Sequence, residues 1–338
     1  MNTQEKNYNL ELIRMCAFMM VVLIHVTNYY CRAYGQISLD QYIFAMVLDN
    51  IARISVPCFF MLTGALLLGR EEPLEKHAKR LLRFLVVTLA WSLIYYIWNR
   101  FVMHSHYDVA VLFEPMEQHL WYLYAMIPIY LVLPFYQVMC RHLSERLERA
   151  LIVVISLAMT FIYISSFFRR EAYYDLPLIG DRSYMFYVFI GYYLHKYLRK
   201  LPGHRMSLAL LFALCMLINM GFTLYITYVR GSHWDRMMEY ANPVLALAAI
   251  AFFVGILKIK DEKWQPKPLA KKIINLFCGC SFGIYLSHII FLDSYKRLVA
   301  ASDVSAYTAI LPLTAAIILL SFSLTWLLRK TKLGRAIT

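Results

Sequence analysis

Apolar segments long enough to cross a lipid bilayer recur along the whole chain. A helix needs about 20 mostly apolar residues to span the hydrocarbon core, and runs of roughly 18 or more are candidates. Ten such segments are predicted, roughly at 10–30, 42–69, 81–103, 119–139, 150–168, 184–198, 206–228, 240–258, 273–294 and 305–328. The polar connections are short, so we expect an all-α integral membrane protein: a single polytopic bundle of about ten transmembrane helices over residues 1–338, with no separate soluble domain.

Basic residues are divided unevenly between alternate connections. The chain contains 34 Lys and Arg residues and has a formal net charge of +13. When the connections are assigned alternately to two sides, 23 of these residues fall on the side that holds both termini and nine on the other. Cytoplasmic loops of membrane proteins carry the excess of Lys and Arg, so both termini are predicted to be cytoplasmic. Membrane topology then explains most of the positive charge, and the remaining basic residues could bind an anionic ligand. No nucleic-acid partner is expected.

The first span contains one permanent positive charge and one titratable imidazole. Arg14 and His25 are eleven residues apart, which on a helix is three turns plus roughly 20°, so both side chains lie on one face about 16 Å apart along the axis. A guanidinium at membrane depth must be paired, reach the interface or face a water-filled cavity, and a histidine there is suspect for the same reason. The pattern is typical either of an anchoring arginine with a hydrogen-bonded core histidine or of a functional site.

The second span contains two opposite charges and a proline. Asp49 and Arg53 are i, i+4 neighbours, and pairing is the cheapest way to keep both charged in a bilayer. Such a pair would either fix the packing of helices or belong to a site. Pro57 removes one backbone donor, so we expect a kink there.

Four cations lie on one helix face at the start of the third span. Lys76, Lys79, Arg80 and Arg83 are spaced at i, i+3, i+4 and i+7, which is one helical stripe. Arg binds phosphate through two parallel hydrogen bonds and Lys adds point charge, so the stripe suits a polyphosphate. Stripes of this kind more often anchor a helix to lipid headgroups, and the sequence leaves both interpretations open.

Imidazole and aromatic side chains mark the start of the fourth span and the middle of the ninth. His119 and Trp121 lie where an aromatic belt is usual, and with a neighbouring Gln they could equally form a sugar-stacking wall. In the ninth span Gly283 should allow close helix approach, while Tyr285 and His288 follow Ser281 on one polar stripe. Together with His25, this brings three imidazoles to membrane depth, which is more than packing alone explains.

Five short motifs occur in an order that resembles the membrane acyltransferase-3 family. They are the Arg14 and His25 pair; the run from Arg53 to Gly64, where the family more often has Ser in place of Thr63; Arg80-x-x-Arg83; His119-Leu120-Trp121-Tyr122; and Ser281 to His288. Each motif is weak alone, but five in this order on a ten-span chain are specific. The resemblance extends from Asn9 to about Arg329 and is greatest to compact bacterial O-acetyltransferases without a fused soluble domain.

The resemblance implies an acyl-CoA-dependent O-acyltransferase of the bacterial plasma (inner) membrane. The expected reaction moves an acetyl group, or another short acyl group such as succinyl, from cytoplasmic acetyl-CoA to a hydroxyl of a cell-envelope glycan or lipid-linked saccharide. The resemblance further implies a catalytic role for His25, and donor handling by Arg14, Arg80 and Arg83. No metal is expected, membrane lipids are the surroundings, and oligomer formation is left open.

The chemistry of acyl transfer asks for a base that works near neutral pH. An imidazole with an unperturbed pKa of about 6.5 qualifies, so we expect His25 to remove the proton of the acceptor hydroxyl. A cation or hydrogen-bond donor must then stabilise the tetrahedral oxyanion. The sequence does not rank the substrate or oxyanion candidates, which are Arg53, Asp49, His119, Trp121, Tyr285 and His288.

Two other classes of function fit the same sequence. A polytopic transporter or flippase for a glycan-linked or anionic substrate would also need many spans and a central polar path. The sequence contains no evident inverted repeat or pair of corresponding broken segments, which favours the enzyme. A non-catalytic partner in polysaccharide assembly is the third interpretation.

Overall fold

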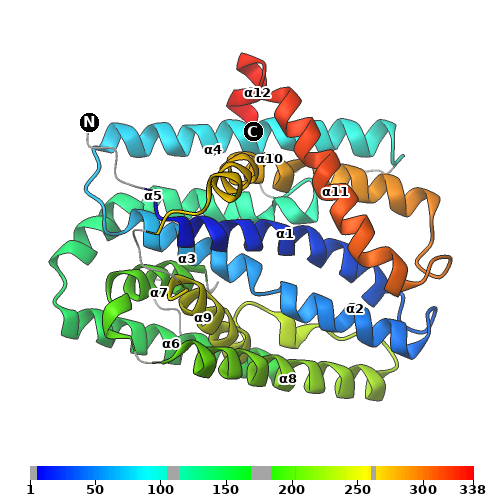
Figure 1. The fold of residues 1–338 in the computed structure, drawn as a ribbon, viewed down its shortest axis with the longest axis horizontal. Helices are drawn as coiled ribbons and strands as arrows, with labels where there is room; N and C mark the ends of the chain where they lie inside the picture. The colour runs from blue at the N-terminus through cyan, green and yellow to red at the C-terminus, as the bar shows by residue number, and fades with distance from the viewer. Residues whose placement is uncertain (1–5, 105–113, 169–183, 202, 260–263) are drawn as a thin grey trace.

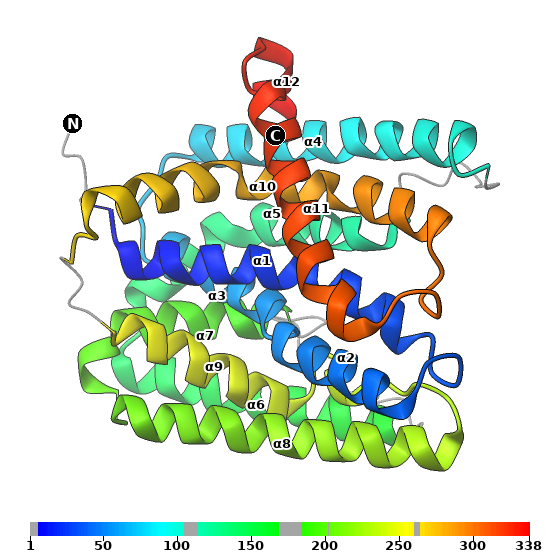
Figure 2. The same cartoon turned by 45° about the vertical axis from the view of Figure 1, so that its right-hand side comes forward.

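The computed structural model describes residues 6–104, 114–168, 184–201, 203–259 and 264–338. Within these ranges the chain is a helical bundle in which most of the long helices run roughly parallel or antiparallel to one another, while the helix over 306–328 crosses them at a steep angle (Figures 1 and 2). The α-helices are α1 Tyr8–Cys31, α2 Leu39–Ala52, α3 Ser55–Leu67, α4 Leu74–Phe101, α5 Trp121–His142, α6 Glu145–Phe167, α7 Tyr184–Lys196, α8 Arg205–Arg230, α9 Pro243–Leu257, α10 Pro268–Leu298, α11 Ala306–Leu328 and α12 Lys332–Ile337. Short 3-10 helices occur at Gln118–Leu120 (η1), Leu198–Lys200 (η2) and Arg236–Met238 (η3).

Nine helices in the described part of the chain are long and apolar enough to cross a membrane, counting α2 and α3 as one segment, Leu39–Leu67. They coincide with nine of the ten predicted spans, and the predicted all-α polytopic membrane bundle is confirmed. The remaining span, 184–198, corresponds to α7, of which the structure describes the 13 residues Tyr184–Lys196; residues 169–183 before it lie outside the described ranges. Most of its side chains are buried, and a helix that is apolar all round belongs in the interior of a bundle.

The second span is broken one turn before the expected kink. α2 ends at Ala52 and α3 begins at Ser55, so the helix is interrupted at Arg53 and Ile54. A proline ring clashes with the carbonyl of the residue four positions earlier, and for Pro57 that residue is Arg53. Pro57 was correctly predicted to distort the helix, but the break occurs at the carbonyl group that its ring displaces, one turn earlier.

α1 occupies the centre of the bundle and contacts α2, α3, α9, α10 and α11. Figure 2 shows it between a group formed by α4, α10 and α11 on one side and the helices α6 to α9 on the other. α6 and α8 are peripheral by contrast, and exposed apolar residues such as Leu157 and Leu217 face outward from them. A side chain on the inner faces of α1 is therefore enclosed by several other helices.

Glycines allow the closest helix contacts. A Cβ atom at Gly64 of α3 would overlap the backbone of Val188 in α7, and one at Gly191 of α7 would overlap the backbone of Met61 in α3. The expected close approach at Gly283 is confirmed, because a Cβ atom there would collide with the Thr325 side chain of α11.

Candidate active site

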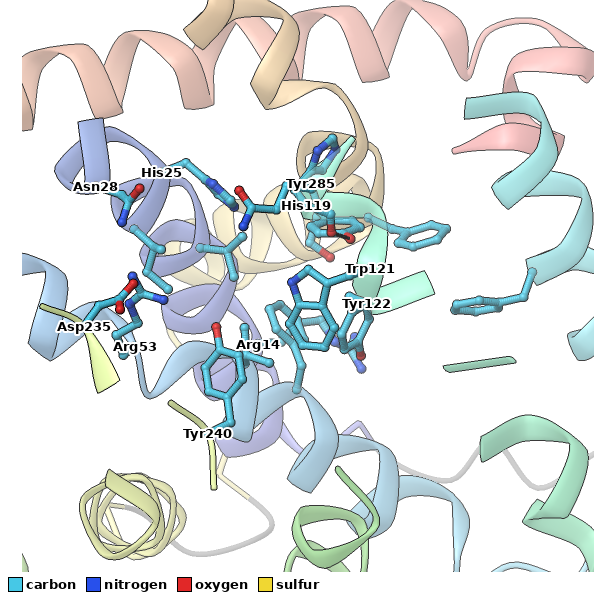
Figure 3. Close-up of a pocket in the computed structure, with 18 of the residues that line it drawn as sticks. Arg14, His25, Asn28, Arg53, His119, Trp121, Tyr122, Asp235, Tyr240 and Tyr285 are labelled. Carbon is cyan, nitrogen blue, oxygen red and sulfur yellow. Dashed lines mark hydrogen bonds between the residues drawn. The ribbon is translucent and has the colours of Figure 1, made fainter. Parts of the chain in front are cut away.

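A cavity of about 290 Å³ lies beside α1 in the middle of the bundle (Figure 3). Side chains from α1, the α2–α3 break, α3, α4, η1, α5, α10 and the connection between α8 and α9 line it. The polar and aromatic lining residues are Arg14, His25, Asn28, Arg32, Arg53, Gln118, His119, Trp121, Tyr122, Asp235, Tyr240, Ser281 and Tyr285.

One face of α1 follows the cavity over most of its length. Arg14, His25, Asn28 and Arg32 all line it, and their spacings of eleven, three and four residues keep them on one side of the helix. Arg14 is also paired, because its guanidinium donates to both carboxylate oxygens of buried Glu11 at 2.9 and 3.1 Å. The charge of Arg14 at membrane depth is therefore compensated in two ways, by an ion pair with a carboxylate and by access to the cavity.

His25, His119 and His288, here called the imidazole cluster, converge from three separate elements. The His25 ring centroid lies 5.0 Å from that of His288 and 6.2 Å from that of His119, and the latter two are 5.1 Å apart. His25 is half-buried with its open side toward the cavity, whereas His119 and His288 are buried. Both ring nitrogens of His119 and Nε2 of His288 are enclosed without a hydrogen-bond partner among the described residues.

Tyrosines hold the cluster in position. The Tyr285 hydroxyl donates to the His119 carbonyl oxygen at 2.5 Å, and the Tyr95 hydroxyl donates to the Leu286 carbonyl oxygen at 2.8 Å. These bonds tie α10 to η1 and to α4. Since the Tyr285 hydroxyl is already engaged, its hydrogen is not directed at the cavity.

The Asp49 and Arg53 pair predicted from the sequence is present. Arg53 Nε donates to Asp49 Oδ2 at 3.1 Å, and Thr27 donates to Asp49 Oδ1 at 2.9 Å. Asp49 is fully enclosed while Arg53 lines the cavity. The helix break thus presents a guanidinium to the cavity at membrane depth, and the carboxylate behind it keeps the charge compensated.

A row of stacked rings forms another wall. Trp121 stacks on Tyr184 at a centroid distance of 5.1 Å and on Tyr240 at 5.7 Å, and Tyr184 stacks on Phe60 at 4.9 Å. Trp121 and Tyr240 both line the cavity (Figure 3). Extended aromatic faces of this kind can pack against the apolar face of a sugar ring.

Lys76, Lys79, Arg80 and Arg83, here called the cation stripe, lie in the first turns of α4 and outside the cavity lining. Lys76 and Arg80 both bind Glu72, at 2.6 and 2.7 Å, and Arg83 donates to the backbone oxygen of Thr338 at 3.0 Å. Burial raises the pKa of Glu72, but the hydrogen bonds from Lys76 and Arg80 outweigh it and hold that pKa below its usual value. Arg80 is one turn before Phe84, which does line the cavity.

The structure therefore brings most predicted site residues to one place. Six of them line the cavity, Asp49 and His288 lie directly behind lining residues, and only the cation stripe stands apart. The predicted site residues did not include Glu11, Asn28, Glu72, Asp235 and Tyr240. Asn28 could have been found, since it shares the α1 face with His25, whereas Asp235 and Tyr240 lie in an irregular connection whose sequence gives no periodic signal.

Fold and site together define a multi-pass membrane protein with a polar, histidine-containing cavity inside the bundle. The family model described as Acyltransferase domain, of the acyltransferase-3 type, matches residues 7–330. The chain therefore belongs to the acyltransferase-3 family, and the protein is a membrane acyltransferase. Searches of curated proteins and of solved structures found no match.

Proposed function

We propose that the protein is an O-acyltransferase of the bacterial plasma membrane. It transfers an acetyl or other short acyl group from cytoplasmic acyl-CoA to a hydroxyl of an envelope glycan or glycolipid. The observation that carries the proposal is the position of His25, which lines the cavity on the same α1 face as Arg14 and Arg32. A base at that depth is accessible to a thioester arriving past Arg14 and to a hydroxyl arriving past Arg32.

The reaction runs as a direct transfer. His25 accepts the proton of the acceptor hydroxyl while its oxygen attacks the thioester carbonyl carbon. The tetrahedral intermediate then collapses, the carbon–sulfur bond breaks, and the CoA thiolate takes the proton back from the imidazolium. The products are an ester and CoA thiol, and His25 returns to its neutral form.

Arg53 is the best-supported candidate for stabilising the oxyanion. A guanidinium has five N–H donors, and Arg53 directs Nε at Asp49 while the residue lines the cavity. Preorganised donors of this kind supply a large part of the stabilisation in acyl transfer. Tyr285 is less suited, because its hydroxyl donates to the His119 carbonyl.

The donor phosphates are assigned to the cation stripe, and the acceptor sugar to the aromatic wall. Arg80 lies one turn from Phe84 and above the Tyr130 ring at 5.9 Å, close to where the pantetheine arm would enter beside Arg14. Binding of CoA phosphates there requires that they replace Glu72 and the Thr338 oxygen as partners of the arginines. Trp121 and Tyr240 offer their faces to the acceptor from another side of the same cavity.

Purified protein reconstituted in vesicles with radiolabelled acetyl-CoA and an envelope glycan tests the proposal. His25→Ala should reduce acyl transfer by about 10²- to 10⁴-fold, the usual contribution of a general base, while CoA binding and the melting temperature stay close to wild type. His142→Ala, which removes an exposed histidine at the end of α5, is the matched control and should be fully active.

Turnover near the wild-type value in His25→Ala would remove His25 from the chemistry. Accumulation of solute in vesicles without cleavage of a thioester would favour the transporter, although family membership supports acyl transfer. Wild-type transfer should also fall as the pH drops through the pKa of His25, because a protonated imidazole cannot accept the hydroxyl proton.

A further inference from the structure

His288 carries a polar atom that the bundle encloses without a partner in the described part of the chain. Its side chain is 0% exposed, and Nδ1 lies 2.6 Å from the carbonyl oxygen of Tyr285. Nε2 is buried and has no hydrogen-bond partner among the described residues. An unpaired polar atom in the interior costs about 1–3 kcal/mol, so a histidine that serves packing alone would be replaced here at a gain in stability.

The bond to Tyr285 fixes which nitrogen of His288 holds the proton. A carbonyl oxygen can only accept, so the hydrogen must be on Nδ1. In a neutral imidazole the other nitrogen is then a bare lone pair. Nε2 of His288 is therefore a hydrogen-bond acceptor, and the neutral ring cannot donate a hydrogen bond from Nε2 to an oxyanion.

Two imidazole rings lie close to the ring that carries this lone pair. The His25 ring is 5.0 Å away at an interplanar angle of 47°, and the His119 ring is 5.1 Å away at 78°. Charged groups near the cluster have partners of their own: Lys296 pairs with Asp293 and Arg53 with Asp49. Among the described residues, the tyrosines whose rings face the cluster include Tyr95 from α4 and Tyr285 from α10.

We propose that His288 is a positioning residue for acyl transfer, whose Nε2 lone pair accepts the ring N–H of His25. The inference rests on the proposed role of His25 as the base. In the structure Nε2 of His288 has no partner within hydrogen-bond distance among the described residues, so the bond forms when the two rings, 5.0 Å apart between centroids, turn toward each other as the substrates bind. It then holds His25 in the one tautomer whose other nitrogen is free to take the acceptor proton. A catalytic base oriented by a third group is a general arrangement, and here the orienting group is a second imidazole.

An imidazole suits this place better than a carboxylate would. A charged group inside the bundle has to be compensated, whereas His288 does the same work as an acceptor while neutral. Its own orientation is set by a backbone carbonyl rather than by another side chain. The chain of fixed contacts thus ends in the α10 backbone, close to Gly283, where α10 packs tightly on α11.

Variants of His288 separate this role from a purely structural one. His288→Leu should lower kcat by about 10- to 100-fold, as is typical for partners that orient a functional histidine, with donor affinity and melting temperature unchanged or higher. His288→Gln keeps an acceptor oxygen near the position of Nε2 and should recover most of the turnover. Ser287→Ala, a neighbouring buried position whose hydroxyl bonds the Gly283 carbonyl, controls for local packing and should be active.

The double variant gives the sharpest test. Because His288 acts through His25, the change His288→Leu should have no further effect on the residual activity of His25→Ala, and such non-additivity marks residues that work as a unit. Independent, multiplying losses would overturn the inference. An alkaline limb in the wild-type pH profile that disappears in His288→Gln would also overturn it, since His288 would then act as a proton donor.

The two proposals fail in different ways. Wild-type turnover in His25→Ala would overturn the proposed function and this inference with it. Loss of activity in His25→Ala, together with wild-type turnover in both His288→Leu and His288→Gln, would overturn only the positioning role.

Discussion

The imidazole cluster and the cation stripe are both polar groups in an apolar protein, yet they are built in opposite ways. In the cluster, ring nitrogens of His119 and His288 are enclosed and lack partners among the described residues. In the stripe, Lys76 and Arg80 share the carboxylate of Glu72, and Arg83 is bonded to the backbone at Thr338. Enclosing the unpaired ring nitrogens of the cluster lowers the stability of the fold. In the stripe the positive charges are compensated and the side chains are partly exposed to solvent.

The difference indicates how each region is suited to act. Unpaired atoms in an interior are rare because they lower stability, so they point to a place where a transient partner completes the bonding during the reaction. Paired cations at a helix end can exchange one anionic partner for another at little cost. Chemistry is therefore expected at the cluster and docking of the donor at the stripe.

The largest effect within the stripe should come from its arginines. Arg80→Ala and Arg83→Ala should each weaken acyl-CoA binding by about 1.5–3 kcal/mol, the usual value of a hydrogen bond to a charged group, which is roughly a 10- to 100-fold rise in Kd. Arg→Lys should restore only part of the affinity, because the bidentate geometry is lost. Calorimetry with CoA in detergent measures the effect.

The control is Lys200→Ala, which removes an exposed cation of η2 that is paired with Glu145 at 2.7 Å. This variant should leave CoA binding unchanged. If wild type, Arg80→Ala and Arg83→Ala insert normally into the membrane and have equal Kd values for CoA, the stripe anchors the helix to lipid headgroups and does not bind the donor.

A smaller effect is expected on stability when an unpaired polar side chain is replaced. His119→Leu relieves a desolvation penalty of about 1–3 kcal/mol but loses ring contacts with a value of about 0.5–1.5 kcal/mol. Its melting temperature should therefore match or exceed that of the wild type in the same detergent.

Asn242→Leu is the matched contrast, because it removes a buried amide that is fully engaged. Asn242 Nδ2 donates to Asn219 at 3.1 Å and to the Met237 carbonyl at 2.6 Å, and its side-chain oxygen caps α9. This variant should be clearly less stable. A lower melting temperature for His119→Leu than for Asn242→Leu would contradict the distinction between the two kinds of polar group.

The smallest effect concerns Glu72, which neutralises two members of the stripe. Glu72→Gln should strengthen CoA binding by about 1 kcal/mol, the order of magnitude of an ion pair near the protein surface. The Glu72 carboxylate is enclosed but its partner Lys76 is exposed, so the gain should shrink at high salt. The native pKa of Glu72 is lowered, so its contribution to stability is present above the pKa of the unfolded chain, about 4.3, and is lost as the pH falls through the native value. Weaker CoA binding in Glu72→Gln would mean that Glu72 orients Arg80 for the donor.

The sequence predicted best what depends on spacing along one helix. The shared face of Arg14 and His25 and the Asp49 and Arg53 pair follow from helical periodicity, and the close approach at Gly283 follows from the absence of a side chain there. The nine long spans follow from apolar length in the same way. α7 lies within the sixth predicted span, 184–198.

Contacts between distant elements lie beyond such reasoning. The sequence placed three imidazoles at membrane depth, but only the packing of α1, η1 and α10 brings their rings to 5–6 Å. Tyr240 reaches the cavity from a connection without periodicity. The pairing of Glu72 with Arg80, eight residues apart, depends on the turn between α3 and α4 rather than on either helix.

The glycine seam between α3 and α7 has a consequence for biogenesis. Gly64 and Gly191 are 127 residues apart, so at a synthesis rate of about 5–20 residues per second α7 emerges roughly 6–25 s after α3. Through that interval α3 resides in the membrane with the groove at Gly64 open to lipid or to a chaperone. The contact between α3 and α7 can therefore form only after the helices α4 to α6 between them have been synthesised.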